Sequence, residues 1–209
     1  MPETLSYQNF CRMCQSAVGR IRANHELLSR LDAAVGDGDH GTTILRAMEA
    51  MAKTVTENSG TDLKELLAKI GWDIMGCDGG STGPLLGSFF TGMSDAVADT
   101  TELDCAAVVA MFDGGVQKVA KQSRARIGDK TMMDAFLPAL DAMHAAAPSG
   151  SIRTVLQQAA QAAATGAEAT KGLRAKFGRA RNLGDRVIGH IDPGAVSVSL
   201  IFNGFSEAL

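Results

Sequence analysis

Residues 36–41 read GDGDHG, and the segments on either side of this glycine-rich loop decide the fold of the chain. The three glycines match the pattern G-x-G-x-x-G, which in dinucleotide-binding proteins follows a buried strand and opens a helix. Here the preceding stretch, LLSRLDAAV (27–35), has the apolar spacing of a helix rather than of a buried strand. We therefore expect a loop between two helices and not a Rossmann-type fold.

Helical periodicity recurs along the rest of the chain. Aromatic residues make up only 5% of the sequence and alanine is abundant, which favours helix over sheet. The stretch AVSVSLIF (195–202) alternates like a strand, but the preceding Asp192-Pro193 is a strong helix start. The sequence predicts an all-α fold of about eight major helices. The expected segments are Ser6 to about Ile21, a short helix near 25–34, Thr42 to Glu57, 62–76, a helix opening at Pro84, 104–122, 131–146, 151–171 capped by Ser151, and Asp192 to the C-terminus.

Composition and charge limit the classes of function. A chain of 209 residues without repeats or linkers fits one domain, residues 1–209. The net charge of −3 argues against nucleic-acid binding, and no apolar run approaches the ~18 residues of a membrane span. The N-terminal MPETLSYQNF has no leader pattern, so we expect a cytoplasmic protein without a membrane partner. Cys11 and Cys14 lack a second pair for zinc and are expected to be buried thiols; Trp72 is also expected in the core.

Three carboxylates, Asp32, Asp37 and Asp39, lie within eight residues on and beside the glycine loop. Neither a P-loop nor an EF-hand fits: the P-loop lysine motif is missing, and an EF-hand starting at Asp37 would place Gly41 and Met48 at ligand positions. The acids could be solvated turn residues. Packed together, however, they would repel one another unless a cation neutralised them. Magnesium binds carboxylates and substrate phosphates together, so we expect the acids to hold metal and the metal to hold phosphate.

Three further glycine-rich segments precede predicted helices: GGSTGP (79–84), IGDKTMMD (127–134) and NLGDRVIGHIDPGA (182–195). A helix start presents free backbone N–H groups to an anion. We expect the four starts to converge at one end of the bundle and form a nucleotide pocket. Residues 172–190 form the only long irregular segment and are rich in glycine and arginine. Such a loop is usually functional or mobile, and here it could be a lid with Arg179 on the phosphates. As an RNA surface it offers only Phe177 for stacking.

Four motifs, LDAAVGDGDHG, GGSTGPLLGSFF, GDKTMMD and IGHIDPGAVS, occur in this order from residue 31 to about 202. Through them the chain resembles the nucleotide-binding L subunit of dihydroxyacetone kinase and the matching domain of single-chain dihydroxyacetone kinases. The resemblance implies an eight-helix antiparallel barrel with ADP or ATP at one end and two Mg²⁺ ions on Asp32, Asp37 and Asp39. The nucleotide-binding residues that it implies are His40, Gly41, Thr42, Thr43, Ser81, Thr82, Met132, Arg179, Asp192, Pro193 and Gly194. No further catalytic residue is assigned.

The resemblance also implies a partner. A separate K-type subunit would hold the ketose, dihydroxyacetone or erythrulose, covalently through a histidine, while this chain delivers the phosphoryl group; a homodimer is a further expectation. His40 is expected to contact the phosphates or the glycine-rich loop rather than to act as a general base. The segment HGTTI (40–44) resembles ATP-dependent single-chain kinases and favours free ATP as donor, although Ser123 stands where a glycine is common. The other donor is bound ADP recharged by a phosphotransferase-system phosphoprotein. A nucleotide-sensing regulator without transfer, and a purely structural bundle, are the alternative functions.

Overall fold

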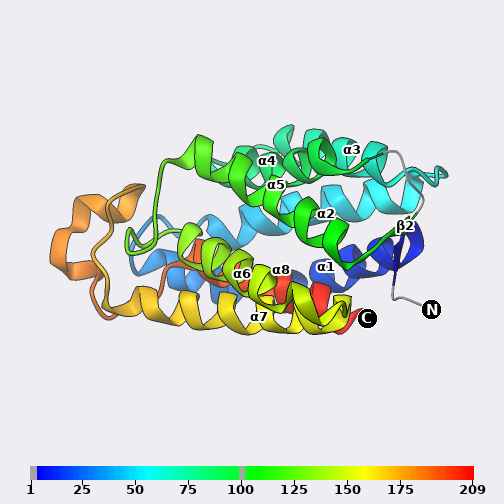
Figure 1. The fold of residues 1–209 in the computed structure, drawn as a ribbon. Coiled ribbons are helices and arrows are strands. Elements are labelled where there is room, and N and C mark those ends of the chain that lie inside the picture. The colour runs from blue at the N-terminus through cyan, green and yellow to red at the C-terminus, as the bar shows by residue number, and fades with distance from the viewer. Residues whose placement is uncertain (1–3, 99–101) are drawn as a thin grey trace.

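The chain folds into a ring of antiparallel α-helices, as seen in a computed structural model that describes residues 4–98 and 102–209 (Figure 1). Each helix packs against the next one along the chain, and the last helix closes the ring against the first. The predicted all-α barrel is confirmed. Its helices are α1 Tyr7–Ala33, α2 His40–Glu57, α3 Leu63–Met75, α4 Thr82–Ala96, α5 Cys105–Ser123, α6 Met133–Ala146, α7 Ile152–Ala169 and α8 Pro193–Glu207.

The remaining elements are short. Strands β1 (Leu5–Ser6) and β2 (Glu102–Leu103) pair antiparallel, with Leu5 opposite Leu103. Three 3₁₀-helices, η1 (Ala147–Ser149), η2 (Thr170–Gly172) and η3 (Arg179–Val187), complete the described part of the chain. Among the described residues, no helix is both long and apolar enough to cross a bilayer.

Side-chain caps set where several helices begin. The predicted caps Ser6, Ser151 and Asp192 each accept a hydrogen bond from the backbone N–H three residues on. Asp62 and Asp104 do the same for α3 and α5. Such caps satisfy one of the backbone donors that a helix start leaves unpaired. Residues 195–202 lie inside α8, so the helical interpretation of this alternating stretch is right.

The centre of the ring is filled by phenylalanines from helices that are distant in sequence. The rings of Phe89 on α4 and Phe136 on α6 have centroids 4.9 Å apart, and Phe112 on α5 lies 5.7 Å from Phe202 on α8. All four side chains are buried. Tilted ring contacts of this kind add to the area that the helices bury, and they make the barrel interior a packed core rather than a channel.

Three sequence expectations need correction. The predicted break between about Ile21 and residue 25 is absent: α1 runs unbroken to Ala33, because no glycine or proline interrupts it there and Leu28 packs into the core. The helix α4 starts at Thr82, so that Pro84 falls in its first turn, where a missing N–H costs nothing. Trp72 is 67% exposed rather than buried, because it lies off the apolar stripe of α3 formed by Leu67, Ile70 and Ile74.

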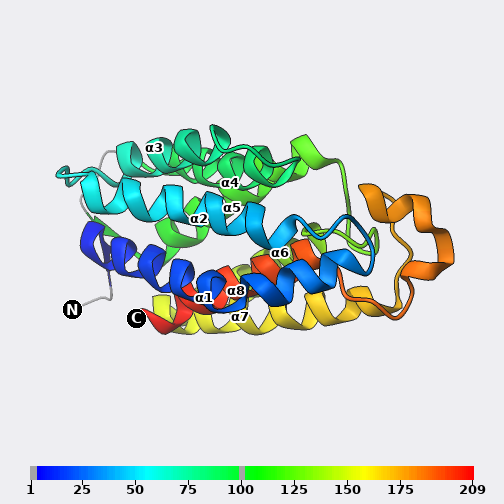
Figure 2. The same cartoon turned by 180° about the vertical axis from the view of Figure 1, so that it is seen from behind.

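The segment 172–190 is not wholly irregular. It contains η3, which is broken at Gly184 by a non-helical conformation, and it returns to α8 at Asp192. In both views the segment, drawn in orange, lies beyond one end of the helical ring (Figures 1 and 2). The starts of α2 and α8 are at this same end, because consecutive helices run in opposite directions. We call residues 171–189 the cap segment.

Candidate functional site

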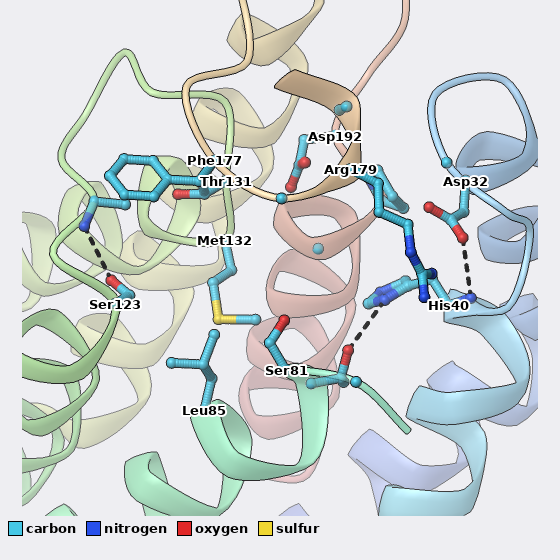
Figure 3. A pocket seen from close by; sticks show the side chains of 18 of the residues that line it. Asp32, His40, Ser81, Leu85, Ser123, Thr131, Met132, Phe177, Arg179 and Asp192 are labelled. Carbon is cyan, nitrogen blue, oxygen red and sulfur yellow. Dashed lines mark hydrogen bonds between the residues drawn. The ribbon is translucent and has the colours of Figure 1, made fainter. Parts of the chain in front are cut away.

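A cavity of about 690 Å³ opens at the end of the ring beneath the cap segment (Figure 3). All four glycine-rich segments contribute to its wall, through Gly36, Gly80, Thr131 and Gly194 among others. The antiparallel order explains this convergence, since it brings the starts of the even-numbered helices α2, α4, α6 and α8 to one end. The volume lies within the range of pockets that take small ligands.

The acidic cluster forms one side of this end. Asp32 in the last turn of α1 and Asp37 and Asp39 on the following loop place carboxylate oxygens within 4.8 Å of one another. Asp32 Oδ2 also accepts a hydrogen bond from the backbone N–H of His40, at 3.2 Å. A Cβ atom at Gly36 would lie 2.4 Å from Asp32 Oδ1, so a side chain at this position would displace the Asp32 carboxylate. The donor set and its spacing suit a hard divalent cation.

Arg179 of the cap segment reaches into this cluster. Its guanidinium pairs with the Asp37 carboxylate and lies 3.6 Å from an oxygen of Asp39. The arginine therefore supplies positive charge to two of the three acids. Like-charged carboxylates at this spacing need such a counter-charge, whether it comes from a side chain or from a metal ion.

His40, the first residue of α2, is buried between two other helices. Its Nε2 lies 2.6 Å from Ser197 Oγ of α8, and its Nδ1 lies 3.4 Å from Thr82 Oγ1 of α4. Burial lowers the pKa of the imidazole, an effect that Asp32 and Asp39 oppose. Both ring nitrogens have neighbours within the protein, so the imidazole joins three helix starts.

Ser81 and Thr82 lie where α4 begins. Ser81 is the N-cap residue, but its hydroxyl makes no capping hydrogen bond, and both residues lie in the cavity wall. Behind them, Gly79 has φ of 143° and packs against Thr43, leaving no room for a Cβ atom. A helix start with free N–H groups at a cavity is a site for an anion.

The opposite side of the cavity is apolar. Figure 3 shows Phe177, Met132 and Leu85 on this side, away from Asp32 and His40. Polar side chains from Gln122, Ser123 and Thr131 border it. The cavity thus has an apolar end and an acidic end, which suits an elongated ligand whose flat apolar group lies at one end and whose anionic group meets the acids through a divalent cation.

Two charged side chains of the cavity wall, Asp192 and Lys130, are shielded from water, Lys130 fully and Asp192 in part. Burial raises the pKa of Asp192 to about 7, although its backbone partner Ala195 and the nearby Lys130 both favour the charged form. The Lys130 side chain is only 2% exposed, and burial lowers the pKa of its ammonium group. Its Nζ donates to the carbonyl oxygen of Thr170 at 2.6 Å and to that of His190.

The structure brings most of the predicted site residues to this cavity. In its wall are Asp32, Asp39, His40, Ser81, Thr82, Met132, Arg179, Asp192, Pro193 and Gly194. Asp37 lies in the acidic cluster outside the wall. Three residues lie elsewhere: Gly41 packs against the backbone of α1, Thr42 is exposed, and Thr43 supports Gly79.

Leu85, Gln122, Lys130 and Thr131 are among the wall residues that were not assigned to the site from the sequence. Lys130 and Thr131 belong to the GDKTMMD segment. Its position just before a predicted helix was the signal that could have placed them in the cavity wall. Gln122 lies near the end of α5, where no glycine-rich pattern marks it. Cys11 and Cys14, predicted as buried thiols, lie half-buried and buried on α1.

Comparison with known proteins places these features in context. The model of the DAK2 domain matches residues 34–207. The chain is 36% identical, over 90% of its length and 89% of the relative's, to the "PEP-dependent dihydroxyacetone kinase 1, ADP-binding subunit DhaL" of Listeria innocua. It is 34% identical to the "L-erythrulose 1-kinase" of Mycolicibacterium smegmatis, over 89% of this chain and 33% of that one.

A similar fold occurs in a solved structure, the dihydroxyacetone kinase of C. freundii "in complex with AMP-PNP and Mg2+". The two superpose with a TM-score of 0.74 and 29% sequence identity over 95% of this chain. The chain spans about a third of the length of that kinase, since the match covers 33% of it.

Proposed function

Because the chain belongs to the DAK2 domain family, we propose that it is the phosphoryl-delivering subunit of a short-ketose kinase. It would transfer phosphate from a magnesium-bound nucleotide to a ketose held by a K-type partner. One observation carries the proposal: Asp32 and Asp39 of the three-carboxylate cluster line the same nucleotide-sized cavity as the start of α4. The names of the relatives, an ADP-binding subunit and an erythrulose kinase, support the same class of reaction.

Asp32, Asp37 and Asp39 would hold the magnesium, as two ions in our proposal. Their oxygens lie within 4.8 Å of one another, and Asp37 and Asp39 are exposed, so ions can reach them. When bound, magnesium neutralises phosphate charge and orients the transferred group. Metal at Asp37 would also compete with Arg179 for this carboxylate and free the guanidinium for phosphate oxygens.

The polarity of the cavity suggests the orientation of the nucleotide. The base would lie against Met132 and Leu85 at the apolar end, with Phe177 of the cap segment beside it. The phosphates would then meet the backbone N–H groups at Ser81 and Thr82, next to the acidic cluster. His40 would position Thr82 rather than accept a proton, since both of its nitrogens already have neighbours. Catalysis in this arrangement is positioning and charge stabilisation.

Calorimetry of ADP binding with and without Mg²⁺ tests the proposal. We expect Asp37→Asn to weaken Mg²⁺-dependent binding at least about 100-fold, because a metal-held phosphate contact contributes several kcal/mol. The helical content should not change, since Asp37 is exposed. Asp95→Asn is the matched control, because it removes an exposed surface carboxylate on α4 that pairs with Lys118. Unchanged ADP affinity in Asp37→Asn would refute the metal role.

A partner is part of the proposal, because none of the described residues around this cavity is an evident covalent anchor for a ketose: the amine of Lys130 already donates to the carbonyls of Thr170 and His190. We expect no phosphorylation of dihydroxyacetone or erythrulose by the chain alone, and turnover once a K-type subunit is added. Robust turnover without a partner would contradict this division of labour. Binding of ADP without transfer under any pairing would instead support the nucleotide-sensing alternative. A cytoplasmic location and a homodimer remain expectations beside this proposal.

Two donors are compatible with the cavity, and each has an observation in its favour. Thr42 and Thr43 favour free ATP, whereas the name of the L. innocua relative favours a PEP-dependent phosphoprotein that recharges bound ADP. A cofactor recharged in place must stay bound, which requires a Kd near or below ~1 nM, or about −12 kcal/mol. Many turnovers with ATP and fast exchange of labelled ADP would establish ATP. A single turnover with ADP that survives gel filtration would establish the phosphoprotein.

A further inference from the structure

The two ends of the cap segment are joined at its base. The backbone N–H of Gly189 donates to the carbonyl of Lys171 at 2.8 Å, and the backbone N–H of Asp192 donates to Thr170 Oγ1 at 2.8 Å. The segment therefore leaves and rejoins the barrel at nearly one point. Any movement of the segment as a unit must turn about this base.

The Lys130 side chain hydrogen-bonds to both ends of the cap segment at this base. Its Nζ donates to the carbonyl oxygen of Thr170, on the entering side of the segment, and to that of His190, on the leaving side. These acceptors are 40 and 60 residues away in sequence. Burying an ammonium group is costly unless its N–H donors are satisfied. Here the group is buried, and two of its three donors bond to the two ends of one segment.

Lys130 also reaches the cavity. It lies in the wall beside Thr131 and Met132, and its backbone has a φ of 59°, a left-handed conformation that residues other than glycine rarely adopt. The cap segment in turn carries Phe177 and Arg179 into the same wall. One buried side chain thus connects the cavity wall to the base of the segment that covers the cavity.

A second connection links the middle of the cap segment to the loop before α6. Lys176 Nζ contacts Asp129 Oδ1 at 2.6 Å; the Lys176 side chain is 65% exposed, whereas that of Asp129 is 9% exposed. The backbone N–H of Lys176 also donates to the carbonyl oxygen of Asp129 at 3.1 Å. Lys176 therefore holds one point of the segment, partly through its backbone, whereas the Lys130 side chain holds both ends.

We propose that Lys130 is a positioning residue that fixes the base of the cap segment, and thereby keeps Phe177 and Arg179 over the cavity and slows nucleotide release. The ligand in this proposal rests on the proposed function, but the hold on the segment does not. The two can fail separately, because the segment is measured without nucleotide and ADP affinity is measured on the unaltered chain.

Hydrogen exchange of the nucleotide-free protein, read by mass spectrometry, tests the hold. In Lys130→Met, which keeps the length of the side chain but removes its donors, exchange in residues 171–189 should rise at least about tenfold. Exchange in α1 to α5 should not change. Lys176→Met is the matched control and should alter cap-segment exchange much less. Equal exchange in Lys130→Met and the unaltered chain, or a rise spread over all helices, would overturn the proposal.

Release of a fluorescent ADP analogue in the presence of Mg²⁺ tests the consequence. We expect release from Lys130→Met to be about tenfold faster, with a smaller change in the association rate, because the segment acts on the bound state. An unchanged release rate would overturn the link to the cavity.

A measurement on the unaltered chain covers the case in which Lys130→Met does not fold. Amine acetylation of Lys130 should occur only when the base of the segment opens, so that ADP with Mg²⁺ slows it at least about tenfold. Exposed Lys53 on α2 is the internal reference and should react equally in both states. Rapid labelling of Lys130 that nucleotide does not change would refute the proposed contact.

Discussion

Asp192 serves both the fold and the cavity. Its carboxylate caps α8 by accepting from the backbone N–H of Ala195 at 2.7 Å, and the residue lies in the cavity wall. Burial raises its pKa to about 7, and the charged groups that act on it are Lys130, which favours the ionised form, and Asp134 and Asp32, which disfavour it. The N-cap of α8 is therefore a carboxyl group whose pKa lies near neutral pH.

This shift predicts a pH dependence of stability in the metal-free protein. The folded chain binds the Asp192 proton more tightly than the unfolded chain, so between pH about 4 and about 7 folding loses stability as the pH rises. The slope is at most about 1.4 kcal/mol per pH unit. Asp192→Asn retains a capping side chain but cannot titrate. As the pH rises from about 4 to about 7, the unfolding free energy of this variant should therefore increase relative to that of the unaltered chain.

Urea denaturation from pH 4 to 8 in the presence of a chelator measures this difference. Asp104→Asn, at the exposed cap of α5, is the matched control for exchanging a capping carboxylate. A difference between Asp192→Asn and the unaltered chain that stays constant over the whole range would contradict the raised pKa.

At the scale of elements, the helices α3 and α4 approach closely through glycines. A Cβ atom on Gly71 would lie 2.5 Å from Thr91 Cγ2 and 2.8 Å from the carbonyl oxygen of Gly87. A Cβ atom on Gly87 would lie 2.6 Å from the carbonyl oxygen of Gly71. The contact sets the spacing of the two helices on either side of the loop that carries Gly79 and Ser81, and so supports the cavity.

Gly71→Ala should therefore destabilise the protein by about 1–3 kcal/mol, because the added methyl group overpacks a contact that includes backbone. Gly19→Ala is the matched control. Gly19 lies inside α1 with nothing within 4 Å of an added Cβ atom, so this change should stabilise by about 0.5–1 kcal/mol. Chemical denaturation measures both. Effects of the same sign would show that helix propensity, and not the contact, dominates at Gly71.

At the scale of the whole molecule, the antiparallel ring places cavity, cap segment and exposed apolar side chains at one end. Ile127 lies in the loop that carries Lys130, and Ile188 lies at the end of the cap segment; they are 58% and 46% exposed. Any partner that receives a phosphoryl group from this cavity must approach the same end. Exposed apolar side chains around a polar site are typical of protein interfaces.

We therefore expect the double variant Ile127→Glu, Ile188→Glu to weaken association with a K-type subunit at least about tenfold, because charged groups would be buried at the interface. ADP affinity should not change, since neither residue lines the cavity. Thr56→Glu, which adds a charge at an exposed position near the end of α2, at the opposite end of the ring, is the control. Surface plasmon resonance gives the comparison, and association as tight as that of the unaltered chain would exclude this face.

Features that depend on neighbouring residues could be predicted before the fold was known. Caps such as Ser6, Ser151 and Asp192 act within three residues, so these helix starts could be predicted. The clustering of Asp32, Asp37 and Asp39 could be predicted because these carboxylates are close in the chain. The error at α1 was also a local one: a break was predicted after about Ile21, although no glycine or proline interrupts the helix there. Trp72 was misplaced by its residue type, although its position off the apolar stripe of α3 was visible.

Features that depend on residues distant in the chain arise only when the helices pack together. Lys130 reads as an ordinary surface lysine, and it is buried because the chain returns to it at Thr170 and His190. Gln122 and Leu85 line the cavity because of how α4 and α5 are rotated within the ring, which local spacing does not specify. Thr43 supports Gly79 rather than facing the cavity for the same reason. Helix caps are local hydrogen bonds, whereas burial and cavity walls arise from the packing of helices against one another.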